Sequence, residues 1–160
     1  MERIRQQVDR MLERIIIGLM GLSVLNVLWQ VTTRSILRDP SSYTEELARF
    51  LLIWLSLLGA AYAVSKKVHL SIDLFTARWE GKKRLYSEIF IEASIFLFAL
   101  LVMIFGGLRL VSITLALQQI SAALQIQLGY VYLVVPLSGL LITFYSAAFI
   151  VEHVKALREE

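Results

Sequence analysis

Long apolar blocks alternate along the chain with short charged segments. Four blocks, at residues 15–33, 47–65, 89–111 and 130–151, approach the length of about 20 residues that a helix needs to cross a bilayer. Backbone polar groups in lipid must be paired within the segment, so such blocks form helices. We therefore predict an all-α membrane protein, a single membrane domain over 1–160 with four transmembrane helices.

Two segments outside these blocks have an amphipathic pattern. Residues 1–14 alternate charged side chains with apolar ones at helical spacing, which predicts a helix lying at the cytoplasmic interface and leading into the first span. A signal peptide is the weaker alternative, because the apolar run continues to Val31 without a small-residue cleavage site. Within 66–87 we expect a short interfacial helix capped by Asp73, with Trp79 at headgroup depth.

Charge predicts the orientation of the four spans. Of the 16 Lys and Arg residues, four precede the first span, six lie in 66–87 and two follow the last span. Positive charge favours the cytoplasm, so both termini and the 66–87 segment are expected there, in a bacterial or archaeal inner membrane. The residues of this segment expected at anionic phospholipid headgroups are Lys66, Lys67, Arg78, Trp79, Lys82, Lys83 and Arg84.

Composition excludes several kinds of site. The chain has no cysteine, so it has no disulfide, thiolate nucleophile or cysteine-based zinc site. It has no basic face with interleaved aromatic residues, so nucleic acid is not an expected partner. His69 and Asp73 are four residues apart, but a zinc site needs three or four ligands and no third is in reach. We expect no cofactor.

Polar residues within the first span need a protein neighbour, because lipid cannot pair them. Asn26 and Gln30 lie one turn apart on one face. They face either another helix of this chain or a partner subunit. On the second span, Ser56/Ala60 and Gly59/Ala63 have small-residue spacings that allow close helix contact.

Charged residues gather at the outer end of the second span. Ser42 and Glu45 fit a capping box that opens this helix. Arg49 is four residues from Glu45 and three from Glu46, so an ion pair along the helix is one interpretation. The other is a docking contact for a second protein. No nucleophile or pocket accompanies these carboxylates, and an enzymatic role is not expected.

The spans lack the parts of a coupled carrier. Their middle depths contain no Asp, Glu, Lys, Arg or His, and no Gly-rich helix break appears. Glu92, in the first turns of the third span, and Glu88 are at helical spacing for a pair with Arg84. One alternative function is a redox-complex anchor binding haem or quinone, which would use His69 or His153; another is a small self-assembling channel.

Several short motifs, taken in order, resemble one family. The first group is Thr44-Glu45-Glu46-Leu47-Ala48-Arg49, then Trp54, then Gly59-Ala60-Ala61, then His69-Leu70-Ser71-Ile72-Asp73. The second is Ser121-Ala122-Ala123-Leu124-Gln125-Ile126, then Tyr130, Tyr132 and Pro136. Over about residues 15–150 they are similar to the small membrane subunit of tripartite ATP-independent periplasmic (TRAP) transporters. A proline often found near Gln127 in that pattern is absent.

The resemblance implies a role in sodium-coupled uptake of an organic acid. In that family a periplasmic protein binds the substrate and a large elevator-type subunit carries the transport sites. The small subunit packs beside the large one and enlarges its static scaffold. The residues we expect at an interface with the large subunit or the binding protein are Asn26, Gln30, Arg34, Glu45, Glu46, Arg49, Trp54, Gly59, His69 and Asp73.

Overall fold

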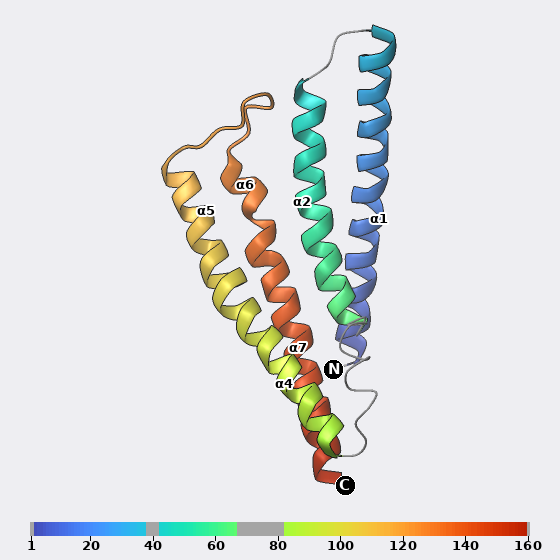
Figure 1. Ribbon diagram of the computed structural model, residues 1–160, viewed down its shortest axis with the longest axis vertical. Coiled ribbons are helices and arrows are strands. Elements are labelled where there is room, and N and C mark those ends of the chain that lie inside the picture. The colour runs from blue at the N-terminus through green and yellow to red at the C-terminus, as the bar shows by residue number, and fades with distance from the viewer. Residues whose placement is uncertain (1, 38–41, 67–81, 160) are drawn as a thin grey trace.

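The computed structural model describes residues 2–37, 42–66 and 82–159 (Figure 1). Several predictions concern residues or side chains outside this part. These are the expected interfacial helix within 66–87, the interface residues His69 and Asp73, and the headgroup residues Lys67, Arg78, Trp79, Lys82, Lys83 and Arg84.

The described residues are almost entirely helical. The elements are α1 (Glu2–Thr32), the π-helical turn η1 (Thr33–Leu37), α2 (Ser42–Ser65), α4 (Lys82–Phe98), the π-helical segment η2 (Ala99–Gly106), α5 (Gly107–Ala116), α6 (Leu128–Tyr132) and α7 (Val134–Glu159).

Four helical stretches are long and apolar enough to cross a membrane, which confirms the all-α, four-helix prediction. They are Arg5–Ile36, Ser42–Ser65, Leu85–Ala116 and Leu128–Lys155. Both ends of the chain lie at the same end of the molecule (Figure 1), called here the terminal end; the opposite end is called the loop end. Which end faces the cytoplasm stays a prediction.

The amphipathic N-terminal segment is part of the first long helix. Residues 2–14 continue without a break into the apolar block, and α1 has 31 residues. At 1.5 Å per residue it is about 46 Å long, which exceeds the ~30 Å hydrocarbon core. The charged first turns of α1 therefore extend the membrane helix instead of forming a separate helix along the interface.

The helices are ordered α1, α2, α7 and then α4 with η2 and α5. α1 packs along α2, α2 packs on α7, and α7 packs on α4 and η2, as Figure 1 shows. The shared core joins α1, α2, α4, η2 and α7. Its most buried members are Leu12, Leu58, Ala61, Ala99, Val134, Tyr145 and Phe149.

Pro136 accounts for the break in the last span. It has no N–H for the carbonyl of Tyr132, and its ring crowds that carbonyl. α6 accordingly ends at Tyr132 and α7 begins at Val134. A Cβ added at Gly107 would lie 3.0 Å from Pro136 Cδ, so the proline packs directly on the start of α5.

The third span differs from the expected regular helix. Its central eight residues, Ala99–Gly106, are π-helical, and the helix continues to Ala116. Gln118 has φ of 48°, which stops the helix there. Gly139 of α7 lies against the π segment, where a Cβ would be 2.7 Å from Met103 Cβ.

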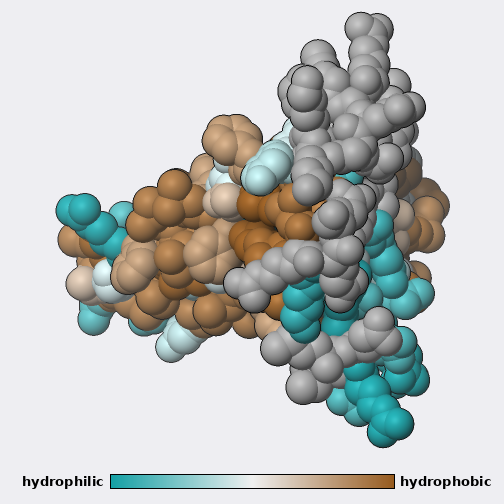
Figure 2. Space-filling model, turned by 90° about the horizontal axis from the view of Figure 1, so that it is seen from below, coloured by the Kyte–Doolittle hydropathy of each residue, from teal (hydrophilic) through white to brown (hydrophobic). Residues whose placement is uncertain are grey.

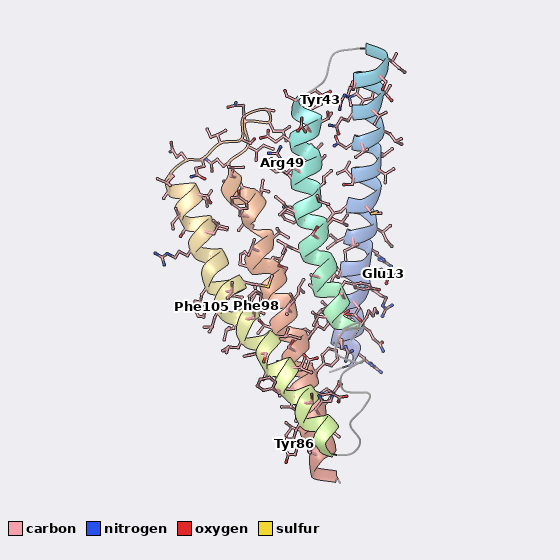
Figure 3. The ribbon with its side chains drawn as sticks, in the orientation of Figure 1. Glu13, Tyr43, Arg49, Tyr86, Phe98 and Phe105 are labelled. Carbon is pink, nitrogen blue, oxygen red and sulfur yellow. The ribbon has the colours of Figure 1, made fainter. Side chains whose placement is uncertain are left out.

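Much of the surface is apolar. Large side chains such as Trp29, Phe90, Phe98 and Phe105 are more than half exposed, and Figure 3 shows Phe98 and Phe105 beside the third span. Viewed from below, brown apolar surface fills much of the left and centre of the visible face, and hydrophilic residues lie at its left tip and lower right (Figure 2). Such faces need lipid or a protein partner.

Candidate interface residues at the two ends of the helices

At the loop end, residues 117–127 form a tight loop between α5 and α6. The Ser121 N–H donates to the Ile126 carbonyl at 2.8 Å, and Ile120 pairs with Gln127. Gln125 has φ of 56°, a left-handed conformation that reverses the chain. Gln127 has φ of −65°, the value that proline requires, so the loop takes this form without one.

Glu46 of α2 binds the backbone of this loop. Its carboxylate accepts three consecutive N–H groups, from Ala122 at 3.2 Å, Ala123 at 2.9 Å and Leu124 at 2.7 Å. Successive N–H groups that point inward make an anion-binding concavity. The expectation that Glu46 pairs with Arg49 is wrong. Its carboxylate joins the second helix to the loop that precedes the fourth.

Glu45 makes the ion pair that was expected along the helix. Its Oε1 lies 3.8 Å from Arg49 Nη2, and both side chains are mostly exposed. Exposed pairs of this kind contribute little stability. Both residues are exposed, as is Arg34 in η1, and a docking contact of these three residues stays a prediction. Figure 3 shows Arg49 on the side of α2 toward α6.

Asn26 is used within the chain. It is only 7% exposed, and its Nδ2 donates to the Thr44 carbonyl at 2.8 Å. We considered that Asn26 and Gln30 face either another helix of this chain or a partner subunit. Asn26 faces another helix of this chain, α2. Gln30, one turn on, is half-buried.

At the terminal end, Asp9 of α1 joins three helices. Tyr145 of α7 donates its hydroxyl to Asp9 Oδ1 at 2.6 Å, and Lys66, after α2, lies 3.3 Å from Oδ2. Desolvation acts to lower the pKa of Lys66, but the hydrogen bond and charge of Asp9 outweigh it, so this pKa lies above its ordinary 10.5. Lys66 is thus bound to a carboxylate of its own chain, and its contact with lipid headgroups stays a prediction.

Arg5 makes a second set of contacts beside Asp9. Its guanidinium donates to the Ser65 carbonyl at 3.2 Å, lies 3.4 Å from Glu152 Oε1 and stacks 4.4 Å above the Phe149 ring. We call Arg5, Asp9, Lys66, Tyr145 and Glu152 the terminal cluster; with the loop contact of Glu46 it ties the two halves of the chain at both ends. Among the described residues no three His, Asp or Glu side chains are placed to hold a metal ion.

Comparison with known proteins decides the family. Residues 23–156 match the family described as tripartite ATP-independent periplasmic transporters, DctQ component. The match includes the last part of α1 and the whole of the other three membrane-spanning stretches. The chain belongs to the DctQ family.

Relatives of this DctQ-family chain are permease proteins. It is 32% identical over 95 residues to the sialic acid TRAP transporter small permease protein SiaQ of Vibrio cholerae, over 59% of this chain and 55% of SiaQ. It is 31% identical over 96 residues to the isethionate TRAP transporter permease protein DctMQ of Oleidesulfovibrio alaskensis, over 60% of this chain and 15% of DctMQ. The sialic acid TRAP transporter permease protein SiaT of Haemophilus influenzae matches at 29% over 90 residues, which is 15% of SiaT. The chain thus spans about half of SiaQ and a small part of the two longer permeases.

Glycines on the first two helices of the DctQ-family chain have open surroundings. A Cβ added at Gly18, Gly21 or Gly59 would meet no described atom within 4 Å. The close contact expected at Gly59 is therefore not made by a described helix of this chain. Trp54, half-buried on the same helix, packs against the core. The close helix contacts within the chain are at Gly107, Gly129 and Gly139 instead.

Two carboxylates of α4, Glu88 and Glu92, have different surroundings. Glu88 Oε2 is 3.5 Å from His153 Nε2, while the pair expected with Arg84 involves a side chain outside the described residues. Glu92 is only 6% exposed, and its Oε2 has no hydrogen-bond partner among the described residues. His153, considered above as a haem ligand, thus lies beside a carboxylate.

The contacts that the sequence did not predict join residues far apart in the chain. Glu46 and Leu124 are separated by 78 positions, and Asp9 and Tyr145 by 136. One signal in the sequence was the position of Asp9 among apolar residues in the first turns of α1. A carboxylate near the bilayer needs a hydrogen-bond or charge partner, so a contact of Asp9 could be expected. Nothing local indicated which tyrosine or which loop would supply it.

Proposed function

We propose that this DctQ-family chain is the small membrane subunit of a TRAP-type secondary transporter. It acts as the stabilising scaffold partner of a large elevator-type subunit during sodium-coupled uptake of an organic acid. A periplasmic binding protein delivers the acid. The observation that carries the proposal is the family match, which runs from residue 23 to residue 156.

The relatives support a large partner. Two of them are permeases in which the segment similar to this chain is 15% of the length. Such lengths fit polypeptides that carry a small and a large part together. The proposed partner of this chain corresponds to the remaining part of such a permease.

The distribution of polar groups favours the role of a scaffold subunit over that of a subunit that carries substrate and ion sites. Charged contacts of the described residues gather at the ends of the helices, as in the Glu46 loop contact and the terminal cluster. Substrate and ion sites of carriers lie near the bilayer midplane, at breaks in helices. We infer that these sites belong to the large subunit.

The open face of α2 supports close packing on that subunit. A Cβ added at Gly59 would meet no described atom within 4 Å, and small residues let the backbones of membrane helices approach each other. We propose Gly59 as a contact point with the large subunit, with Arg34, Glu45 and Arg49 at the loop end near the large subunit or the binding protein.

Co-purification and transport test the proposal. The chain is tagged, expressed with the large permease encoded beside it, extracted in mild detergent and reconstituted with the cognate binding protein. Sialic acid and isethionate, named for two relatives, are the first substrates to try. Uptake should require sodium, the large subunit and this chain; a complex that transports equally well without this chain would contradict the proposal.

A matched pair of variants tests the contact face. Gly59→Leu should leave the isolated chain folded, because space is open there, and should reduce recovery of the large subunit. Gly18→Leu places the same side chain at an open position of α1. If wild type and Gly59→Leu recover equal amounts of the large subunit, Gly59 is not part of the interface. The proposed subunit role would still stand.

A further inference from the structure

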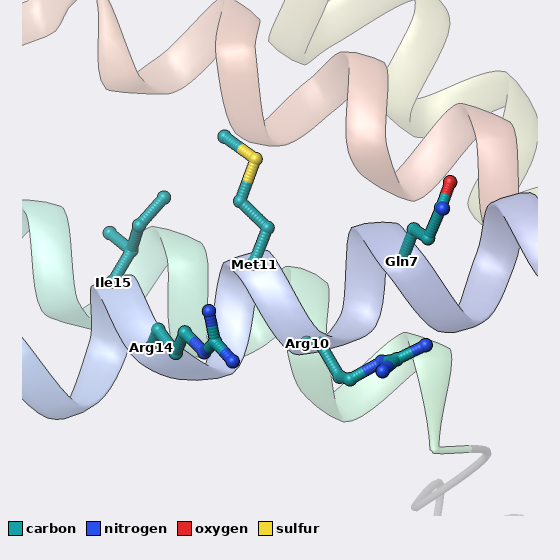
Figure 4. A pocket seen from close by; sticks show the side chains of 5 residues that line it. All are labelled: Gln7, Arg10, Met11, Arg14 and Ile15. Carbon is teal, nitrogen blue, oxygen red and sulfur yellow. The ribbon is translucent and has the colours of Figure 1, made fainter.

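A hollow of about 420 Å³ lies on the surface of α1, near the terminal end. The side chains that line it come from one side of this helix (Figure 4). They are Gln7, Arg10, Met11, Arg14 and Ile15.

The two arginines of the hollow differ from the neighbouring cations. Arg5 and Lys66 are each paired with a carboxylate. In contrast, Arg10 donates only its Nε to the Gln6 carbonyl at 3.3 Å, and no carboxylate of the described residues lies within ion-pair distance of Arg10 or Arg14. Both are exposed. Two positive charges thus face the hollow without a described anion.

The spacing of the arginines suits a phosphate group. Arg10 and Arg14 are four residues apart, which separates them by about 6 Å along the helix axis. The planar guanidinium offers paired N–H donors that match phosphate oxygens. Two such forks, one turn apart, can hold a single phosphate between them.

The apolar members of the hollow indicate a lipid over a soluble anion. Met11 is 66% exposed and Ile15 is 38% exposed, and Ile15 begins the predicted first span. The hollow therefore has cationic groups at headgroup depth and apolar groups where acyl chains begin. An isolated phosphate would make no use of Met11 and Ile15.

We propose that this hollow binds the headgroup of an anionic phospholipid, with the phosphate between Arg10 and Arg14 and the acyl chains along Met11 and Ile15. These residues are distinct from those predicted at headgroups from the sequence. The proposal depends on insertion in a membrane and not on the transport role.

Native mass spectrometry of the purified full chain in a neutral detergent tests it. Phosphatidylglycerol and phosphatidylcholine are titrated separately, and the lipid-bound fraction is measured. Near a membrane surface each basic residue contributes a factor of roughly five in anionic-lipid affinity. Arg10→Gln and Arg14→Gln should each weaken phosphatidylglycerol binding by about that factor, and the double variant by more.

Matched controls separate a built site from general charge. Arg109→Gln removes an exposed arginine of α5 and should leave phosphatidylglycerol binding unchanged. The double replacement of Arg10 and Arg14 by lysine keeps the charge and loses the forks, so binding should be intermediate. Circular dichroism checks that every variant keeps its helicity.

Three results would overturn the proposal. Phosphatidylcholine binding as tightly as phosphatidylglycerol would remove the role of lipid charge. An equal loss in Arg109→Gln and in the hollow variants would show non-specific attraction. Displacement of the lipid by inorganic phosphate would indicate a site for a soluble anion.

Discussion

Alanine in place of glycine should have opposite effects at Gly139 and Gly59, although both lie in membrane helices. At Gly139 the added Cβ would be 2.7 Å from Met103 Cβ and 3.3 Å from the backbone nitrogen of Ile104. These atoms are on or next to the backbone, so no rotamer change relieves the contact. Carbon atoms pack at about 3.5–4.0 Å, and the two helices would have to separate locally by roughly 1 Å.

The magnitude follows from two opposing effects. Alanine is favoured over glycine inside a helix by about 1 kcal/mol. Overpacking of a tight contact costs about 1–3 kcal/mol. Gly139→Ala should therefore be less stable than Gly59→Ala by about 1–3 kcal/mol, because Gly59 gains the helix preference without meeting any described atom.

Reversible unfolding in mixed detergent micelles, followed by circular dichroism, measures this difference. Gly18→Ala is a second control at an open position and should behave like Gly59→Ala. If Gly139→Ala is as stable as Gly59→Ala, the close packing of α7 on the π segment is refuted.

Three other substitutions test polar contacts. Glu46→Lys should speed amide hydrogen exchange of residues 122–124, with a smaller effect for Glu46→Gln, which keeps an acceptor; unchanged exchange would show that the loop holds without the carboxylate. Asn26→Ala should cost about 1 kcal/mol of unfolding free energy, the usual size for an interhelical hydrogen bond in a membrane, and a neutral result would show that water replaces the amide. Because Asp9 raises the pKa of Lys66 above 10.5, the pair stabilises the fold below that pH and its contribution is lost as the pH rises through the raised value. The difference in melting temperature between wild type and Lys66→Gln should shrink as the pH rises above 10.5, and a difference independent of pH would exclude the ion pair as its cause.

The four helices were predictable because lipid imposes a simple length rule. The continuity of α1 was not, since an amphipathic pattern fits a helix lying on the membrane as well as one that packs against neighbours. Asp9 decides between them in the structure, because Tyr145 and Lys66 bind it within the chain.

The spacing of glycines in the sequence does not predict which helices pack closely together. Gly59 and Ala63 permit close approach, but the pattern does not say which helix approaches. The structure uses Gly139 and Gly107 within the chain and leaves Gly59 open. The role of Glu46 was hidden for a similar reason, since its three donors belong to a loop whose conformation depends on two left-handed residues.

The order of the helices has a mechanical consequence. A row of helices resists shear within its own plane, but its resistance to bending falls steeply as its thickness decreases. Toward the loop end, α1 and the third span form the two edges of such a row, with α2 and the fourth span between them. The contacts of Glu46 and of the terminal cluster hold neighbouring helices at a set distance within the row. They restrict bending of the row less. Another protein bound along one of its broad faces would increase the thickness of the assembly and therefore its resistance to bending.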